Sequence, residues 1–178
     1  CKDCKNLDIR YIKNPNNRGS SSSNLNNGIL NSSFDILKFL MQDEYIYDID
    51  ALKDIKFAFD NPSINWVATG CYYGNSPDHP LGKMIPIYTN DIIQGNNLIG
   101  SPSIISIRRT DDIEFFNPDL IWLMDCEYYK RLYDKWGSPH VIPKYSIFVN
   151  QHENQLTNIL SKEIKQYEHQ ILKNKYHK

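Results

Sequence analysis

Short apolar runs alternate with segments of helical periodicity along most of this chain. Apolar or alternating runs predict strands at residues 7–13, 35–41, 64–73, 98–108 and 141–149. Apolar residues that recur every three or four positions predict helices at 22–32, 48–59, 119–135 and 155–178. Strands and helices that alternate in this way are typical of a layered α/β domain. Loops are expected where no period is present, at 14–23 and 74–95.

The last predicted helix is amphipathic. One face carries leucine, isoleucine and tyrosine, and the other carries lysines, namely Lys162, Lys165, Lys173, Lys175 and Lys178. A basic face of this kind suits either peripheral contact with a membrane surface or plain solvation, which is the commoner case. We expect residues 161–178 to form a C-terminal helix appended to a domain that covers residues 1–160.

Composition narrows the class of protein further. The chain has 178 residues, 40% of them hydrophobic and 23% charged, and a formal net charge of −1. These values fit a globular domain, or a large piece of one, and give no basic footprint for nucleic acid. The sequence contains neither an apolar run of the roughly 18 residues that a membrane span needs nor the apolar stretch of a signal peptide at its start.

The four cysteines fall into two pairs of different character. Cys1 and Cys4 form a CxxC pair without the second ligand pair that a structural zinc site needs. Cys71 and Cys126 lie in apolar or aromatic surroundings and are expected to be buried thiols. This usage is typical of a reducing compartment, so the expected location is cytoplasmic.

Three polar clusters directly follow or interrupt apolar runs, where ligands of open α/β sheets commonly bind. The first is Gln42-Asp43-Glu44, whose adjacent carboxylates suit either a divalent cation or the cap of the next helix. The second is Asp125, which suits either a buried general base or a structural residue at a helix start, with Glu127 as the neighbouring alternative.

The third cluster begins at His152 and includes Gln155. A histidine just past a strand suits a metal or phosphate contact, although a surface-loop histidine is commoner. The five histidines show no HExxH pattern, and the sequence has no glycine-rich phosphate loop and no GxSxG motif.

At these clusters the sequence resembles the family 2 glycosyltransferases of the GT-A fold. Residues 39–44 (FLMQDE) are similar to that family's acidic cation-binding motif, and residues 97–103 (NLIGSPS) to its acceptor-side segment. Residues 122–132 (WLMDCEYYKRL) resemble the segment whose aspartate is the catalytic base, and residues 152–157 (HENQLT) the motif near the donor diphosphate. Residues 14–29 resemble the family's Asn- and Gly-containing loop and helix. Each motif is weak alone, but five in order are fairly specific.

The resemblance implies a fold, an activity and a set of site residues. The fold is a GT-A mixed sheet flanked by helices, and the activity is inverting transfer of a sugar from a nucleotide-sugar donor to a glycan or lipid-linked acceptor hydroxyl, as in cell-surface polysaccharide biosynthesis. Asp125 is the implied base. The implied cofactor is Mg²⁺ or Mn²⁺, held by Asp43, Glu44 and His152. The implied donor contacts are Asn26, Gln42 and Gln155, and the implied acceptor contacts are Gly100, Ser101, Pro102, Trp122 and Glu127.

The sequence departs from the family pattern in its acidic motif, in its closing motif and in its N-terminal part. Met41 stands at the first acidic position, Glu44 at the last, and Thr157 where serine is usual. The family's N-terminal nucleotide-binding strands are absent, so residues 1–160 correspond to the C-terminal two-thirds of its domain. We therefore expect an exposed sheet edge that lowers stability or promotes association. The competing hypotheses are a non-catalytic carbohydrate- or protein-binding α/β module and an inactive fragment.

Overall fold

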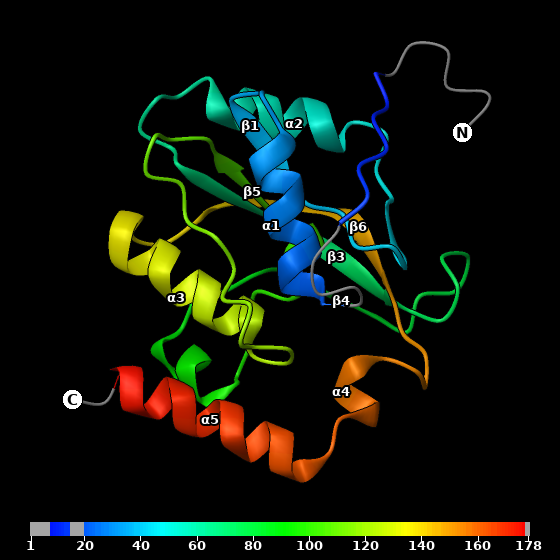
Figure 1. Ribbon diagram of the computed structural model, residues 1–178. Coiled ribbons are helices and arrows are strands. Elements are labelled where there is room, and N and C mark those ends of the chain that lie inside the picture. The colour runs from blue at the N-terminus through cyan, green and yellow to red at the C-terminus, as the bar shows by residue number, and fades with distance from the viewer. Residues whose placement is uncertain (1–7, 15–19, 177–178) are drawn as a thin grey trace.

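The computed structural model describes residues 8–14 and 20–176 and shows a curled mixed sheet flanked by helices (Figure 1). The strands are β1 Ile36–Lys38, β2 Glu44–Ile46, β3 Trp66–Gly74, β4 Gly82–Met84, β5 Ile105–Arg108 and β6 His140–Asn150. The α-helices are α1 Ser21–Asn31, α2 Ala51–Phe59, α3 Met124–Trp136, α4 Leu156–Ile159 and α5 Lys162–Tyr176. Two short 3₁₀ helices, η1 Asn90–Gln94 and η2 Pro102–Ile104, complete the elements. The mixed α/β class expected from the sequence is confirmed.

The strand order of the sheet is β1-β5-β3-β6-β2, and β4 pairs with the second half of β3. β3 and β6 run parallel, whereas β5 is antiparallel to both β1 and β3. It follows that β1, β3 and β6 all point the same way. They point toward the same edge of the sheet, although β1 ends level with Val67, near the start of β3, and β3 and β6 run on together to Gly74 and Asn150.

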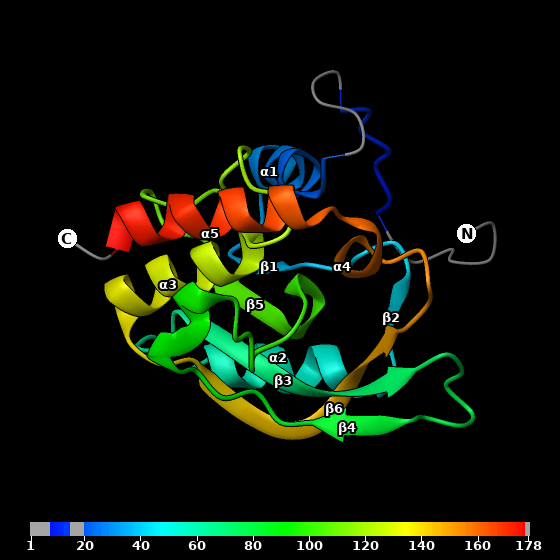
Figure 2. The same cartoon turned by 90° about the horizontal axis from the view of Figure 1, so that it is seen from below.

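The two faces of the sheet carry separate apolar cores because strand side chains alternate between faces. Trp66 and Ala68 of β3 belong to the larger core, which contains residues of α1 and α3 and includes Leu172 of α5. Val67, between them, packs on the other face with Ile55 and Phe59 of α2. Figure 2 shows α1, α3 and α5 together along one side of the sheet.

The sheet curls where β6 is irregular. The register between β3 and β6 jumps at Gly70, so that Thr69 lies opposite Ile142 but Gly70 lies opposite Tyr145. The unpaired residues include Pro143, which has no N–H to give to the ladder. A Cβ at Gly70 would lie 2.9 Å from the carbonyl oxygen of Lys144, so only glycine allows the two backbones to come this close.

Several predicted boundaries need correction. The helix expected at 155–178 is broken, because Leu160 takes an extended conformation between α4 and α5. The strand expected at 98–108 is confined to Ile105–Arg108, and the helix expected at 119–135 begins only at Met124. The strand expected at 35–41 is limited to Ile36–Lys38. Residues 8–13 form no strand, and the rest of that prediction lies outside the described residues, as do Cys1 and Cys4.

Two further observations bear on the sequence predictions. Cys71 and Cys126 are free and buried, as expected. Within residues 8–14 and 20–176, no helix is long and apolar enough to cross a membrane.

Candidate active site

A cavity of about 620 Å³ lies beyond the carboxyl ends of β1 and β6. The segments that follow β1 and β6 form much of its wall, the start of α1 forms another part, and the loop before η2 and the start of α3 complete it. Eight of the twelve residues that the sequence predicted for the site line this cavity. They are Gln42, Asp43, Glu44, Ser101, Pro102, Asp125, His152 and Gln155.

Asp43 and His152 are in direct contact in the cavity wall. The Nε2 of His152 lies 3.1 Å from Oδ2 of Asp43, and both side chains are about one-third exposed (36% each). The two residues are 109 positions apart in sequence, and they meet because Asp43 precedes β2, which pairs antiparallel with β6, and His152 follows β6. Gln155 lies beside them, and its amide donates a hydrogen bond of 2.8 Å to the carbonyl oxygen of Asn150.

Glu44 has different surroundings from its neighbour Asp43. Its Oε2 accepts a hydrogen bond of 2.6 Å from the hydroxyl of Ser101. Burial raises the pKa of Glu44, against the opposing effect of hydrogen bonds from Ser101 and Ser103. Of the two carboxylates, Asp43 is therefore the better placed to bind a cation.

Lys38 was not singled out from the sequence, yet its charge interacts with that of Glu44. Burial lowers the pKa of Lys38 to about 7, and the carboxylate of Glu44 opposes that shift. Its Nζ donates to the carbonyl oxygens of Ser103 and Ile105. Lys38 thus ties β1 to the start of β5, directly behind the segment that carries Ser101.

Asp125 lies in the first turn of α3 and opens onto the cavity. Its Oδ1 accepts a hydrogen bond of 2.7 Å from the backbone N–H of Cys126, and its Oδ2 accepts one of 2.8 Å from Nδ2 of Asn97. Burial raises the pKa of Asp125 to about 6, although both hydrogen bonds oppose the rise. A carboxyl group with a pKa near neutrality suits a general base.

The start of α3 is held in place from α5. The residue before the helix, Leu123, offers no side-chain cap. Instead, the buried carboxylate of Glu168 accepts three hydrogen bonds of 2.8–2.9 Å from the backbone N–H groups of Ile121, Trp122 and Leu123. The C-terminal helix therefore acts as a brace for the turn that presents Asp125.

The remaining four predicted site residues lie outside the cavity wall. The side chain of Asn26 bonds both the N–H and the carbonyl of Phe116, and Trp122 packs edge-on against His169 of α5. Glu127 is buried in an ionic cluster between α3 and α5. Gly100 adjoins Ser101 and takes a φ of +104°, a conformation that favours glycine.

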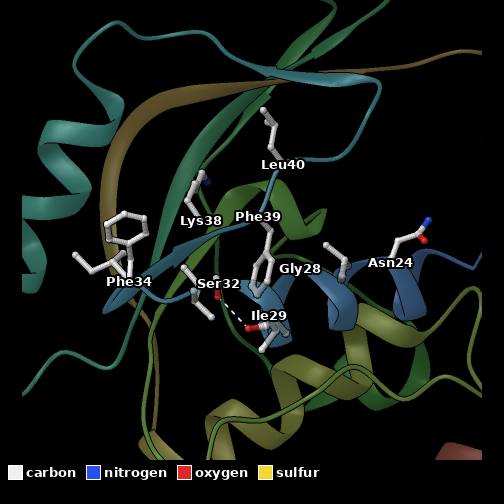
Figure 3. Close-up of a pocket in the computed structure, with 11 residues that line it drawn as sticks. Asn24, Gly28, Ile29, Ser32, Phe34, Lys38, Phe39 and Leu40 are labelled. Atoms are coloured by element: carbon white, nitrogen blue, oxygen red, sulfur yellow. Dashed lines mark hydrogen bonds between the residues drawn. The ribbon is translucent and has the colours of Figure 1, made fainter. Parts of the chain in front are cut away.

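A second, smaller groove of about 380 Å³ runs between α1 and β1 (Figure 3). Its lining is mainly apolar and includes Ile29, Phe34, Phe39 and Leu40. Within it the hydroxyl of Ser32 donates to the carbonyl oxygen of Ile29 at 2.9 Å. The groove shares Asn24, Leu25 and Leu40 with the cavity, but no carboxylate lines it.

The side chains that line the cavity supply some, but not all, of the ligands that a divalent cation needs. Among the residues that the structure describes, no three His, Cys, Asp or Glu side chains are grouped to hold a metal ion. The pair Asp43 and His152 nevertheless fits, because two ligand atoms about 2.1 Å from one ion and at right angles to each other lie about 3 Å apart. Mg²⁺ commonly takes one or two carboxylates and completes its shell with phosphate oxygens and water.

Three residues with clear roles in this site were missed by sequence reasoning. Lys38, Asn97 and Glu168 act through partners 28 or more positions away in the sequence. Of the three, only Asn97 could have been found from the sequence, because it begins the segment NLIGSPS, whose later residues were singled out.

No protein-family model matches the chain, and no curated protein matches it either. The assignment of function therefore depends on the geometry of the site.

Proposed function

We propose that this protein is an inverting glycosyltransferase of the GT-A type, in which Asp125 is the general base. The observation that carries the proposal is the convergence of five sequence segments on one cavity. That cavity places a carboxyl group with a raised pKa together with an Asp–His pair suited to a cation-bound diphosphate. The resemblance to family 2 motifs, and the mixed α/β fold, support the same function.

In this proposal Asp125 takes the proton of an acceptor hydroxyl. The acceptor oxygen then attacks the anomeric carbon, the bond from that carbon to the donor diphosphate breaks, and the diphosphate leaves. The carboxylate of Asp125 accepts hydrogen bonds from the backbone N–H of Cys126 and from Asn97, which fix its orientation. A base with a pKa of about 6 is ionised at neutral pH yet still strong enough to accept a proton.

Asp43 and His152 would hold the divalent cation, and Gln155 lies beside them on the same wall. A bound cation supplies charge neutralisation for the leaving diphosphate. Ser101 and Pro102, which also line the cavity, would shape the acceptor side. Glu44 serves this side as well, because it fixes the hydroxyl of Ser101.

The test is a transfer assay with a panel of UDP- and GDP-sugars, Mn²⁺ and a mixture of glycan and lipid-linked acceptors. Asp125→Asn should lower the transfer rate by about 10²- to 10⁴-fold, because it removes the base, while the rise in melting temperature with donor and Mn²⁺ is retained. Asp119→Asn, a change at an exposed carboxylate in the preceding loop, is the matched control and should transfer at the wild-type rate.

Normal transfer by Asp125→Asn would contradict the assignment of the base. A donor-induced rise in melting temperature without any transfer, in the wild type, would favour a non-catalytic carbohydrate-binding module instead.

A further inference from the structure

The loop that precedes η2 is organised around one side chain, that of Asn97. Its Oδ1 accepts hydrogen bonds from the backbone N–H groups of Ile99 (3.0 Å) and Gly100 (2.9 Å). Its Nδ2 donates to the carbonyl oxygen of Gly100 (3.0 Å) and to Oδ2 of Asp125 (2.8 Å). Three of these bonds lie within the acceptor-side loop, and the fourth joins the loop to Asp125 of α3. All four are made by a single amide group.

The loop fixes which way this amide faces. Two backbone N–H groups require an oxygen on one side of the amide, and the carbonyl of Gly100 requires an N–H on the other. Only the second N–H of Nδ2 then remains for Asp125, so the contact from Asn97 to Asp125 is a donated hydrogen bond. A donor of this kind stabilises the ionised carboxylate, which is an acceptor only.

We propose that Asn97 is the positioning residue of this site, whose Nδ2 holds Oδ2 of Asp125 and favours the ionised carboxylate. The hydrogen bond fixes the orientation of the carboxylate at the cavity wall, and its catalytic consequence rests on the proposed function. The hydrogen bond itself is measurable in any case. Because the amide is held by the 97–100 loop, the geometry of the acceptor side and the state of the base are coupled through one residue.

Other ionisable groups face Asp125 and have to be separated from the effect of Asn97. Cys126 and Tyr129 lie on the same helix, and burial raises the pKa of both far enough that they stay neutral near pH 6. Across the cavity lie Asp43, Glu44 and His152. A test that changes Asn97 alone leaves all of these groups in place.

The experiment follows the carboxyl carbon of Asp125 by ¹³C NMR from pH 3.5 to 8.5. Asn97→Ala removes the donor and should raise the titration midpoint of Asp125 by about one pH unit. Asn97→Asp keeps an oxygen for the N–H groups of Ile99 and Gly100 but places a second carboxylate against Asp125. It should raise the midpoint further.

Tyr129→Phe is the control for a merely structural role. The hydroxyl of Tyr129 donates to the same carbonyl of Gly100 (3.1 Å) but not to Asp125, so its loss should leave the midpoint within roughly 0.2 pH units of wild type. Should an Asn97 variant not fold, the side-chain amide of Asn97 in the wild type decides: its ¹⁵N shift should titrate with the same midpoint as Asp125.

An unchanged midpoint in the folded variants, or a wild-type amide that does not titrate with Asp125, would overturn the positioning role. In the transfer assay, the acidic limb of the pH–rate profile should move upward with the NMR midpoint. Absence of transfer from every donor would count against the glycosyltransferase proposal alone, since the NMR titration reports on Asn97 without it.

Discussion

Asp125 and Glu127 are only two residues apart in α3, but they lie on different faces of the helix and have opposite surroundings. Asp125 opens onto the cavity, where it accepts hydrogen bonds from Asn97 and Cys126 and burial raises its pKa to about 6. Glu127 is 1% exposed, and its carboxylate accepts hydrogen bonds from Arg131 (2.8 and 2.9 Å) and Lys175 (2.6 Å). Burial alone would raise the pKa of Glu127, but Arg131 and Lys175 outweigh it and hold that pKa below its usual value.

The two carboxylates therefore have different roles in the fold. Glu127, with Arg131, Lys175 and the hydroxyl of Tyr176, joins α3 to α5 and serves stability. Figure 1 shows these two helices side by side. Asp125 is held in an environment that disfavours its charge, which is the cost that reactive carboxylates commonly carry.

Removal of Glu127 should give the largest effect. Glu127→Ala leaves Arg131 without its buried partner and should lower the free energy of unfolding by about 3 kcal/mol or more at pH 7. Asp125→Asn, at the other face, should leave it unchanged or raise it. Urea unfolding of both variants measures the contrast, which fails if the two lose equal stability.

The pH dependence of stability should have opposite signs at the two carboxylates. The raised pKa of Asp125 contributes stability that is complete below about pH 4 and is lost as the pH rises to about 6. Relative to wild type, Asp125→Asn should therefore gain roughly 2–3 kcal/mol between pH 4 and pH 7. The lowered pKa of Glu127 contributes stability above about pH 4.5 that is lost as the pH falls through its folded value.

Urea unfolding at several pH values between 3.5 and 7.5 checks this prediction on wild type, Asp125→Asn and Glu127→Gln. The deficit of Glu127→Gln should shrink toward acid pH, while the gain of Asp125→Asn should grow toward neutral pH. Parallel curves for the three proteins would show that neither carboxylate has the surroundings described.

Loss of the brace from α5 should have an intermediate effect. Glu168→Gln cannot accept all three hydrogen bonds equally well and should cost about 1–2 kcal/mol. Amide exchange of Ile121, Trp122 and Leu123 should speed up at the same time. Gln166→Ala, a change at an exposed position of the same helix, is the control and should alter neither quantity.

Tyr176→Phe should give the smallest effect. It removes one hydrogen bond of 3.2 Å to Glu127 and leaves the two cationic partners, so about 0.5–1 kcal/mol should be lost in urea unfolding. Tyr167→Phe provides the exposed counterpart on α5 and should be neutral. A loss as large as that of Glu127→Ala would mean that the hydroxyl, and not the cations, dominates this cluster.

The long periodic segments were predictable, and the short ones were not. The helix expected at 22–32 is α1, displaced by one residue, and the strand expected at 141–149 lies within β6. β2 and β4 have three residues each, too few to show a period, and both were missed. The start of α3 was placed five residues early, because the turn before it is set by Glu168 from 45 or more positions away.

The candidate site divides in the same way. The clusters at Asp43 and His152 were predictable as polar segments at strand ends. Their contact was not, because it follows from the antiparallel pairing of β6 with β2, a strand that was missed. The local pattern of the sequence could not decide between Asp125 and Glu127, and only the family resemblance implied Asp125 as the base. Two residues of a helix that are two positions apart point about 200° apart, and the pattern does not say which direction is the cavity.

By itself, then, the sequence determined the layered α/β class and the polar segments that end the parallel strands, because both follow from local periodicity and strand direction. Only the tertiary structure decided which carboxylate lies in the cavity, which one is paired with Arg131, and which amide holds Asp125. The physical reason is that burial and charge partners set the state of an ionisable group, and here those partners, such as Asn97 for Asp125 and Lys175 for Glu127, lie 28 to 48 positions away along the chain.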